Sequence, residues 1–242
     1  PKAVDIVGSR EYDGTTNIVA SDISGITGTV NSETLTMSSG LGTTSSENVG
    51  TYSLTDTSAG SLTLGNGTGL ASNYTLTGGT QTYTIEKRIL NSSGSKIYDA
   101  NTNALAADIT LSNLVSGETL NHSGTATLSS ANAGSYTISN LTGISIADNA
   151  GLASNYTLTG GTHNFTVNQK AISLSGTRLY DATTDAVASD LTTISGRVGS
   201  ETLTLSGTGS VADANVDPNK AVTVGTLALG DGTGLAANYT LS

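Results

Sequence analysis

The chain has 242 residues and a mass of 24.1 kDa, enough for one large domain or a few small ones. It contains no Cys, which excludes disulfide scaffolds, zinc-ribbon domains and cysteine nucleophiles. Nine basic against nineteen acidic residues give a formal net charge of −10, which disfavours binding to nucleic acids and to anionic membranes. Hydrophobic residues make up 36% of the chain, yet no apolar stretch reaches the about 18–20 residues of a membrane span. We therefore expect a folded chain with no membrane span and no nucleic-acid partner.

Short runs with apolar or tyrosine side chains at every second position occur at 34–37, 51–54, 61–64 and 82–85. An alternation of period two predicts β-strands with one buried face. Clusters of Gly, Asn, Asp and Ser lie between the runs and predict turns. No apolar stripe of helical spacing extends beyond two turns, so the pattern favours an all-β fold.

The same succession of motifs then recurs, giving three copies along the chain. Each copy opens with a Lys, continues with a Tyr-Asp pair, carries Glu-Thr-Leu near its middle and closes on Gly-Leu-Ala-x-Asn-Tyr-Thr-Leu. The tyrosines of the Tyr-Asp pairs and the asparagines of the closing motifs serve as repeat anchors: Tyr12, Tyr98, Tyr180, Asn73, Asn155 and Asn238. Spacing this regular shows that one structural unit is repeated in tandem.

The period of about 82–86 residues approaches the ~100 residues of an immunoglobulin-like sandwich. It predicts tandem immunoglobulin-like β-sandwich modules forming an extended rod, with domains at 1–86, 87–169 and 170–242. No flexible spacer separates the copies, so three modules should span roughly 100–120 Å. The third copy ends without the segment that the others carry at 80–85 and 162–167, so we expect it to be truncated or completed by a strand from elsewhere.

The YDGTT at 12–16, its YDA relatives at 98–100 and 180–182, and the closing GLASNYTLTGGT resemble the YDG-type repeats of large bacterial surface exoproteins. These are the filamentous-haemagglutinin-like and related glycine-rich adhesins. The resemblance implies a secreted protein of the bacterial cell surface. Its repeats would be a stalk or spacer that supports cell adhesion or biofilm attachment, with neighbouring repeats of the same parent protein as partners.

Two other functions remain open at the level of sequence. The repeats could be a ligand-binding region for host or surface glycans, because the third copy carries NVDPNK at 215–220 where the others carry strand-like segments, and because Thr-x-Thr rows could tile a flat face. Alternatively, the chain could be a subunit of an extracellular filament, a homopolymer in which a donated strand completes the third module.

We expect no enzymatic activity, catalytic residue or bound cofactor. The two histidines, His122 and His163, lie at different places in the repeat, and no Ser or Asp partner is singled out for either. Calcium is the one metal considered, because carboxylates recur at three positions in each copy. The candidate ligands are Asp13, Asp22, Glu33, Asp99, Asp108, Glu118, Asp181, Asp190 and Glu201. The alternative is that these are turn-forming Asp and solvated Glu residues.

Two covalent modifications also remain open. The opening lysines Lys2, Lys87 and Lys170 could each join the anchor Asn of the same copy in an isopeptide bond, as in some adhesin sandwiches; the alternative is that the Asn serves a turn. The Asn-Tyr-Thr of every copy and the Asn-Gly-Thr at Asn66 match the N-glycosylation acceptor pattern.

Overall fold

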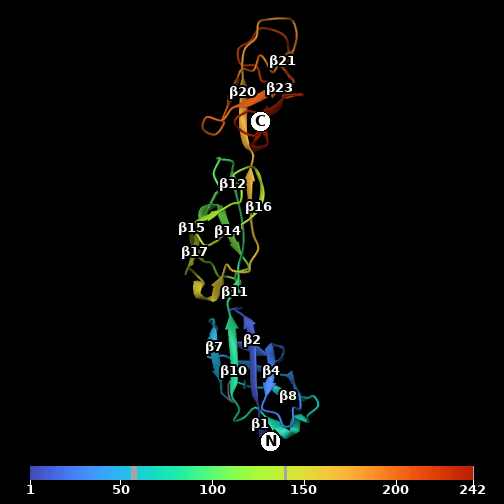
Figure 1. Cartoon of the computed structure of the whole chain (residues 1–242), viewed down its shortest axis with the longest axis vertical. Helices are drawn as coiled ribbons and strands as arrows, with labels where there is room; N and C mark the ends of the chain where they lie inside the picture. The colour runs from blue at the N-terminus through green and yellow to red at the C-terminus, as the bar shows by residue number, and fades with distance from the viewer. Residues whose placement is uncertain (56–58, 139–140, 242) are drawn as a thin grey trace. The chain divides into compact units, whose positions relative to one another are not determined.

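The computed structural model describes residues 1–55, 59–138 and 141–241 (Figure 1). Among these residues the chain is all-β, with short strands, five three-residue 3-10 turns and no helix of seven or more residues. The expectation of an all-β fold is confirmed. No helix of the described residues is long and apolar enough to cross a membrane.

The described residues of the first repeat, 1–55 and 59–86, form ten strands. They are β1 (Lys2–Ala3), β2 (Asp5–Glu11), β3 (Asn17–Val19), β4 (Ile23–Thr27), β5 (Leu35–Ser39), β6 (Leu41–Thr43), β7 (Gly50–Leu54), β8 (Thr63–Asn66), β9 (Tyr74–Thr75) and β10 (Gln81–Glu86). The largest sheet has the order β4-β2-β10-β7, and the pairs β1-β9, β3-β6 and β5-β8 are separate ladders. Strands therefore occur at or next to all four runs that the alternation predicted.

The opening and closing strands of this repeat lie side by side in the largest sheet. β10 pairs in parallel with β2, from Gln81 opposite Ile6 to Glu86 opposite Glu11. Its Gln81, Tyr83 and Ile85 are buried, and the residues between them are more exposed, so the period-two pattern places one face in the core. The closing strand thus contributes Tyr83 and Ile85 to the apolar core of its repeat.

The second repeat follows the same plan. Its strands are β11 (Arg88–Ile89), β12 (Asn91–Ile97), β13 (Asn103–Leu105), β14 (Ile109–Ser112), β15 (Asn121–Thr127), β16 (Gly134–Thr137), β17 (Ile144–Ala147), β18 (Tyr156–Thr157) and β19 (His163–Asn168). The order β14-β12-β19-β16 matches that of the first repeat, and β12 pairs in parallel with β19.

The third repeat has a smaller central sheet. Its strands are β20 (Lys170–Ser175), β21 (Asp185–Val187), β22 (Thr193–Ser195), β23 (Leu203–Ser206), β24 (Thr208–Ser210), β25 (Ala228–Asp231) and β26 (Tyr239–Leu241). The central sheet is β22-β20-β26, and the pairs β21-β24 and β23-β25 are separate. The described residues of this repeat contain no counterpart of β10 or β19.

The chain forms two compact units, and the second repeat contributes to both. Unit 1 comprises 1–91, 111–122 and 146–161, and unit 2 comprises 92–110, 123–145 and 162–242. Each unit therefore holds residues of two successive repeats. The predicted domain boundaries at 1–86, 87–169 and 170–242 stay a prediction.

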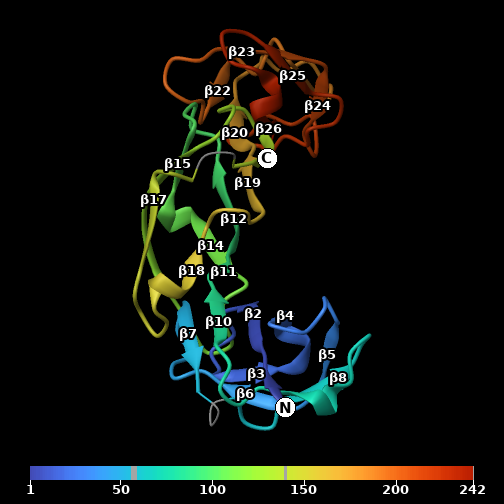
Figure 2. The same ribbon diagram turned by 60° about the horizontal axis from the view of Figure 1, so that its bottom comes forward.

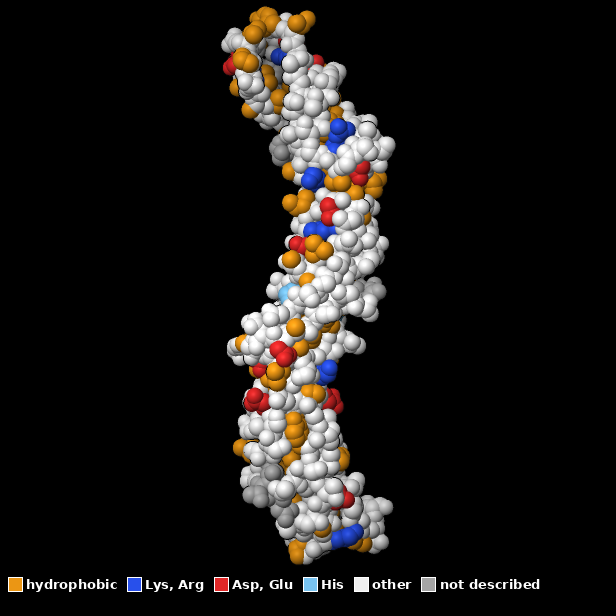
Figure 3. Space-filling view, turned by 90° about the vertical axis from the view of Figure 1, so that its left-hand side faces the viewer, with side chains coloured by type: hydrophobic (Ala, Val, Ile, Leu, Met, Phe, Trp, Pro, Cys, Tyr) orange, Lys and Arg blue, Asp and Glu red, His pale blue; other side chains and the backbone are white. Residues whose placement is uncertain are grey.

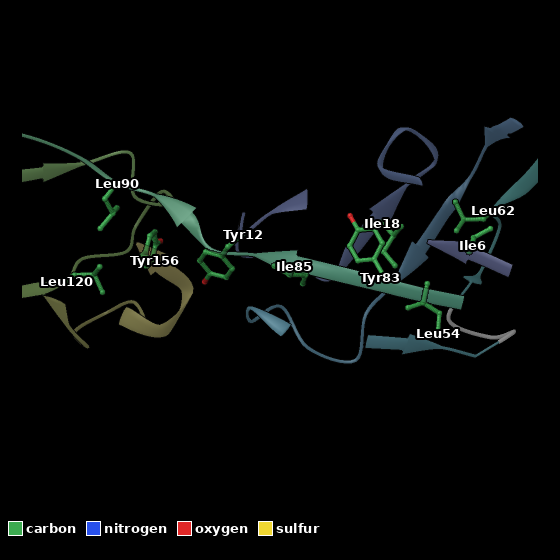
Figure 4. Close-up of a cluster of buried hydrophobic side chains, with 10 residues drawn as sticks. All are labelled: Ile6, Tyr12, Ile18, Leu54, Leu62, Tyr83, Ile85, Leu90, Leu120 and Tyr156. Carbon is green, nitrogen blue, oxygen red and sulfur yellow. The ribbon is translucent and has the colours of Figure 1, made fainter. Parts of the chain in front are cut away.

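A cluster of buried apolar side chains runs through unit 1 (Figure 4). Its members come from the first repeat and from the start and end of the second: Ile6, Tyr12, Ile18, Leu54, Leu62, Tyr83, Ile85, Leu90, Leu120 and Tyr156. Leu90, Leu120 and Tyr156 belong to the second repeat, so the apolar core continues from one repeat into the next. Burial of an apolar side chain contributes about 1.5–3 kcal/mol, so this shared core couples the two repeats energetically.

Candidate functional site

The residues that recur most regularly in the sequence meet where one repeat contacts the next. In unit 1, the carboxylate of Glu118 accepts two hydrogen bonds. Tyr12 of the first repeat donates its hydroxyl to Oε1 at 2.5 Å, and Tyr156 of the second donates to Oε2 at 2.5 Å. Hydrogen bonds to a charged group are stronger than neutral ones, about 1.5–3 kcal/mol each. Glu118 therefore connects the two repeats through both of its oxygens.

The tyrosine rings and an asparagine amide complete this contact. The rings of Tyr12 and Tyr156 meet edge to face, with centroids 5.5 Å apart and an interplanar angle of 82° (Figure 4). The Asn155 amide lies beside them: its Oδ1 accepts from the backbone N–H of Val49 at 2.9 Å, and its Nδ2 donates to Oδ1 of Asn48 at 2.9 Å. Tyr12, Asn48, Glu118, Asn155 and Tyr156 are hereafter called junction 1.

Unit 2 contains the same arrangement one repeat later. Tyr98 and Tyr239 donate to Oε1 and Oε2 of Glu201 at 2.7 and 2.5 Å. Their rings are 5.4 Å apart at 81°. Asn238 accepts from the N–H of Ala133 at 2.8 Å and donates to Asn132 at 3.0 Å. Tyr98, Asn132, Glu201, Asn238 and Tyr239 are hereafter called junction 2.

Local backbone structure places these side chains. The anchor asparagines end 3-10 turns, η2 (Ala71–Asn73), η4 (Ala153–Asn155) and η5 (Ala236–Asn238), and the next residue is the closing Tyr. Each glycine that opens the closing motif faces the Glu: a Cβ on Gly151 would lie 2.4 Å from Glu118 Oε2, and one on Gly234 would lie 2.5 Å from Glu201 Oε2. Only glycine permits the carboxylate to approach the backbone this closely.

Burial and the neighbouring carboxylates shift the tyrosine pKa values. Burial first, and then the hydrogen bond to Glu201, raises the pKa of Tyr98 to about 12. Burial and Glu118 likewise raise the pKa of Tyr156 to about 12 and the pKa of Tyr12 further still. The phenols are therefore neutral over the physiological range, so each keeps the proton that it donates to a carboxylate oxygen.

The first and third repeats each carry residues that correspond to one side of a junction, but the other side is not present within residues 1–242. In the first repeat, Tyr74 donates to Glu33 at 2.5 Å, as Tyr156 does to Glu118, but residues 1–242 supply no Tyr-Asp motif from an earlier repeat to this carboxylate, and Asn73 is exposed. In the third, Tyr180 is 65% exposed, whereas Tyr12 and Tyr98 are 2% and 4% exposed. Identical local sequence thus gives different environments, according to whether a neighbouring repeat is present.

The Asp of each Tyr-Asp pair organises the turn that follows the Tyr. Oδ1 of Asp13, Asp99 and Asp181 accepts from the backbone N–H two residues on, at 2.9, 3.1 and 2.9 Å. Each also pairs with a cation three residues before it, Arg10, Lys96 or Arg178. The bonds from Thr183, first backbone and then side chain, lower the pKa of Asp181.

The residue after this Asp has left-handed backbone geometry in all three copies. Gly14 has φ of 75°, and Ala100 and Ala182 have φ of 64° and 62°. Glycine adopts this region freely, whereas a side chain makes it costly. The change from YDG to YDA therefore keeps the turn at the expense of backbone strain.

The structure disperses the acidic residues considered as calcium ligands. Asp22 accepts from the Tyr83 hydroxyl at 2.8 Å, Glu118 and Glu201 lie in the junctions, Glu33 accepts from Tyr74, and Asp108 and Asp190 are half-buried. Within 1–55, 59–138 and 141–241 no three His, Asp or Glu side chains form a group that could hold a metal ion.

The other candidate residues lie as follows. His163 is buried in β19, with Nδ1 3.0 Å from Ser92 Oγ, and His122 is half-buried in β15. Lys2 donates to the carbonyl of Gly28. In the β1-β9 pair, Lys2 lies opposite Tyr74, the residue that follows Asn73 in the sequence. The amides of Asn155 and Asn238 are engaged in the junctions. Isopeptide formation and glycosylation stay open.

Four junction residues were not singled out from the sequence: Asn48, Asn132, Tyr156 and Tyr239. Asn48 and Asn132 begin corresponding segments, NVGTYSL and NAGSYTI, and the two tyrosines follow the anchor asparagines in the closing motif, so the repeat itself was the available signal. Glu118 and Glu201 were singled out, but as metal ligands.

The fold and these contacts define a tandem-repeat protein whose recurring residues connect successive repeats. The YDG domain model matches the chain three times, over residues 1–85, 81–164 and 162–242, and the chain belongs to this family. Searches of curated protein sequences and of solved structures found no match.

Proposed function

We propose that this chain is a structural stalk or spacer of a secreted bacterial cell-surface adhesin, built from immunoglobulin-like sandwich modules in an extended array. The observation that carries the proposal is the recurrence of one contact: junctions 1 and 2 use the same residue types, the same donors and acceptors, and nearly the same ring geometry. A contact that recurs between successive copies is what a tandem spacer needs, because it fixes each module on the one before it.

The composition of each junction favours a defined angle between modules over a flexible linkage. A carboxylate held by two tyrosine hydroxyls, two rings at a fixed angle and an amide bonded through both of its polar atoms restrain position and rotation together. The chain between repeats also contains no Gly/Ser-rich spacer. These features support a semi-rigid array.

The surface is consistent with a spacer in water. Uncharged polar side chains and backbone cover most of the face shown in Figure 3, and charged side chains are scattered over it. The net charge of −10 opposes association of like chains. Adhesin membership, secretion and a cell-surface location rest on the family resemblance and stay part of the proposal.

Small-angle X-ray scattering of the full chain tests the spacer. We expect a maximum dimension of roughly 100–120 Å, from the rise per residue of modules placed end to end. The double variant Glu118→Ala, Glu201→Ala should broaden the distance distribution, because both junctions lose their shared acceptor. Glu33→Ala is the matched control, since Glu33 binds Tyr74 but no tyrosine of another repeat. A compact wild-type particle, or equal effects of the double variant and the control, would contradict the proposal.

A glycan array probed with the labelled chain separates the spacer from the ligand-binding alternative. A spacer binds no glycan saturably. Saturable binding that is lost on replacing 215–220 with the corresponding segment of the second repeat would favour a binding region instead.

A further inference from the structure

In the first and second repeats, the long opening strand and the closing strand lie side by side and run in parallel. β2 pairs with β10 over six residues, and β12 pairs with β19 over six residues. The four strands are labelled in Figure 2. We call these two pairings the parallel ladders. Because the strands are parallel, the chain enters a ladder at one end and leaves it at the opposite end.

This direction determines how tension along the chain acts on a repeat. A pull on the entering and leaving segments slides the two strands past each other, so all six pairs of a ladder resist together. If the strands were antiparallel, the two segments would meet at the same end and the pairs would break one after another. Peeling spreads the work over about 7 Å of extension per pair, since each strand frees about 3.3 Å per residue. Sliding concentrates the same work in a shorter displacement and therefore needs a larger force.

Backbone contacts extend both ladders beyond their six pairs. Where the chain leaves a ladder, the N–H of Tyr12 donates to the carbonyl of Glu86, and the N–H of Tyr98 donates to the carbonyl of Asn168, both at 2.9 Å. Where the chain enters, β1 pairs in parallel with β9, and β11 pairs in parallel with β18. The opening segment of each repeat is thus held along most of its length by later segments of the same repeat.

The parallel ladders lie inside their sheets. The strand orders are β4-β2-β10-β7 and β14-β12-β19-β16, so the strands of each ladder are the two central ones. The closing strands also bury one face: Tyr83 and Ile85 are 0% exposed, and Phe165 and Val167 are 1% exposed. Flanking strands and a buried face limit the access of water that could replace a broken hydrogen bond, which favours rupture of the ladder as a unit.

A buried side-chain contact fixes the register at the same point of both ladders. In the first repeat, Gln81 Oε1 accepts from the N–H of Ile6 at 2.9 Å, and its Nε2 donates to the carbonyl of Val4 at 3.1 Å. In the second, Ser92 Oγ lies 3.0 Å from Nδ1 of His163. Gln81 and His163 are 2% and 6% exposed. Sliding must break these buried hydrogen bonds, which is costly, so they oppose the first step of the motion.

We propose that the parallel ladders bear tension along the chain: β2 with β10, and β12 with β19, are loaded in shear and set the force at which a repeat unfolds. Forced unfolding is governed by the unfolding rate, so the contacts that must break first matter more than the total stability. This inference deepens the proposed function and rests on it for the source of the load, because a spacer that holds a cell to a surface transmits a pull. The resistance to shear is a property of each repeat and is measured separately.

Optical tweezers applied to the full chain in two directions test the ladder of the second repeat. The chain has no native Cys, so paired Cys substitutions define where the handles attach. Ser93→Cys with Asn168→Cys puts the handles toward opposite ends of the ladder and loads it in shear. Ser93→Cys with Asn164→Cys is the matched control, because these two residues lie opposite each other and the same strands are pulled apart sideways. All three side chains are exposed, so the core is unchanged.

The expected result is an unfolding force several times higher in shear than in the control direction. The gain in contour length should be nearly the same in both, because the two pairs of attachment points enclose almost the same length of chain. This gain identifies the event as unfolding of the second repeat.

Ser92→Ala separates resistance to shear from stability. It removes the buried hydrogen bond to His163 at the start of the ladder. Ile144→Val is its control, since Ile144 is 7% exposed but lies in β17, which belongs to a different sheet. Urea denaturation measures the free energy of unfolding of each variant. For the same loss of this free energy, Ser92→Ala should lower the shear force more than Ile144→Val.

Equal unfolding forces in the two pulling directions would overturn the proposal, and so would an equal loss of shear force in the two variants at matched stability. Scattering tests the spacer independently. An extended particle with equal forces would keep the spacer and reject the load-bearing ladder, whereas a compact particle with unequal forces would reject the spacer and keep the resistance to shear.

Discussion

The hydroxyl of Tyr98 donates a 2.7 Å hydrogen bond to Oε1 of Glu201, although 103 residues separate them and they belong to different repeats. The first of these residues lies in a Tyr-Asp motif, and the second lies in the Glu-Thr-Leu motif of the following copy. Tyr12 and Glu118 have the same relationship one repeat earlier. The repeated motifs therefore encode contacts between copies as well as the core of each copy.

Asn155→Ala should destabilise the chain much more than Asn73→Ala, although both residues lie in the same GLASNYTLTGG sequence. Asn155 is 1% exposed and satisfies the N–H of Val49, which its removal would leave without this partner. An unsatisfied buried polar group costs about 1–3 kcal/mol. Asn73 is exposed, so its replacement should change the free energy of unfolding by less than about 0.5 kcal/mol. Urea denaturation measures both, and equal effects would contradict a junction role for Asn155.

Ala182→Gly should stabilise the third repeat by about 1 kcal/mol, because φ is 62° at this exposed position and glycine removes the strain of a left-handed Ala. Ala100→Gly should act in the same direction. Gly14→Ala is the reciprocal change and should destabilise, since φ is 75° and a Cβ would also lie 3.0 Å from Val115 Cγ1. Thermal unfolding followed by circular dichroism checks the signs, and a lower midpoint for Ala182→Gly would show that this turn carries no strain.

The β-class and the repeat were predictable from the sequence because both depend on local patterns. Alternation of period two predicted strands at 34–37, 51–54, 61–64 and 82–85, and the structure has strands at or beside all four. Clusters of Gly, Asn and Asp predicted the turns between them. The partners of Glu118 and Glu201 were not predictable in this way. A tyrosine and a glutamate more than 100 residues apart meet only because one repeat packs on the next, and periodicity carries no information on that packing.

Asn73 and Asn155 show most directly what cannot be predicted from local sequence. Their local sequences are the same, yet one side chain is exposed and the other is 1% exposed with two hydrogen-bond partners in the preceding repeat. The difference is the presence of a neighbouring repeat, which no local pattern contains. For the same reason the carboxylates of Glu118 and Glu201 appeared as candidate metal ligands in the sequence, since a hydrogen bond to a distant tyrosine leaves no local signature.

Alkaline pH should weaken junction 2. Tyr98 has a pKa of about 12 in the folded chain, raised from 10.0 by burial and by the hydrogen bond to Glu201. The folded state therefore holds this proton more tightly, so the stability that Tyr98 contributes is complete below pH 10 and falls as the pH rises toward 12. Unfolding free energies measured from pH 9 to 12 should decline, and Tyr98→Phe should show a smaller decline. Superimposable pH profiles for wild type and variant would contradict this assignment.

Gly234→Ala should destabilise junction 2 through a steric conflict with Glu201. The new Cβ would lie 2.5 Å from Glu201 Oε2 and 3.0 Å from its Cβ, so the carboxylate must move away from Tyr239 or Tyr98. Overpacking of this kind costs typically 1–3 kcal/mol. The double variant Gly234→Ala, Glu201→Ala removes the conflicting atoms, so its destabilisation should be smaller than the sum of the two single changes. Additive single effects in urea denaturation would show that the glycine does not act through the carboxylate, and the close approach of Gly234 would then not explain why glycine stands at this point of every copy.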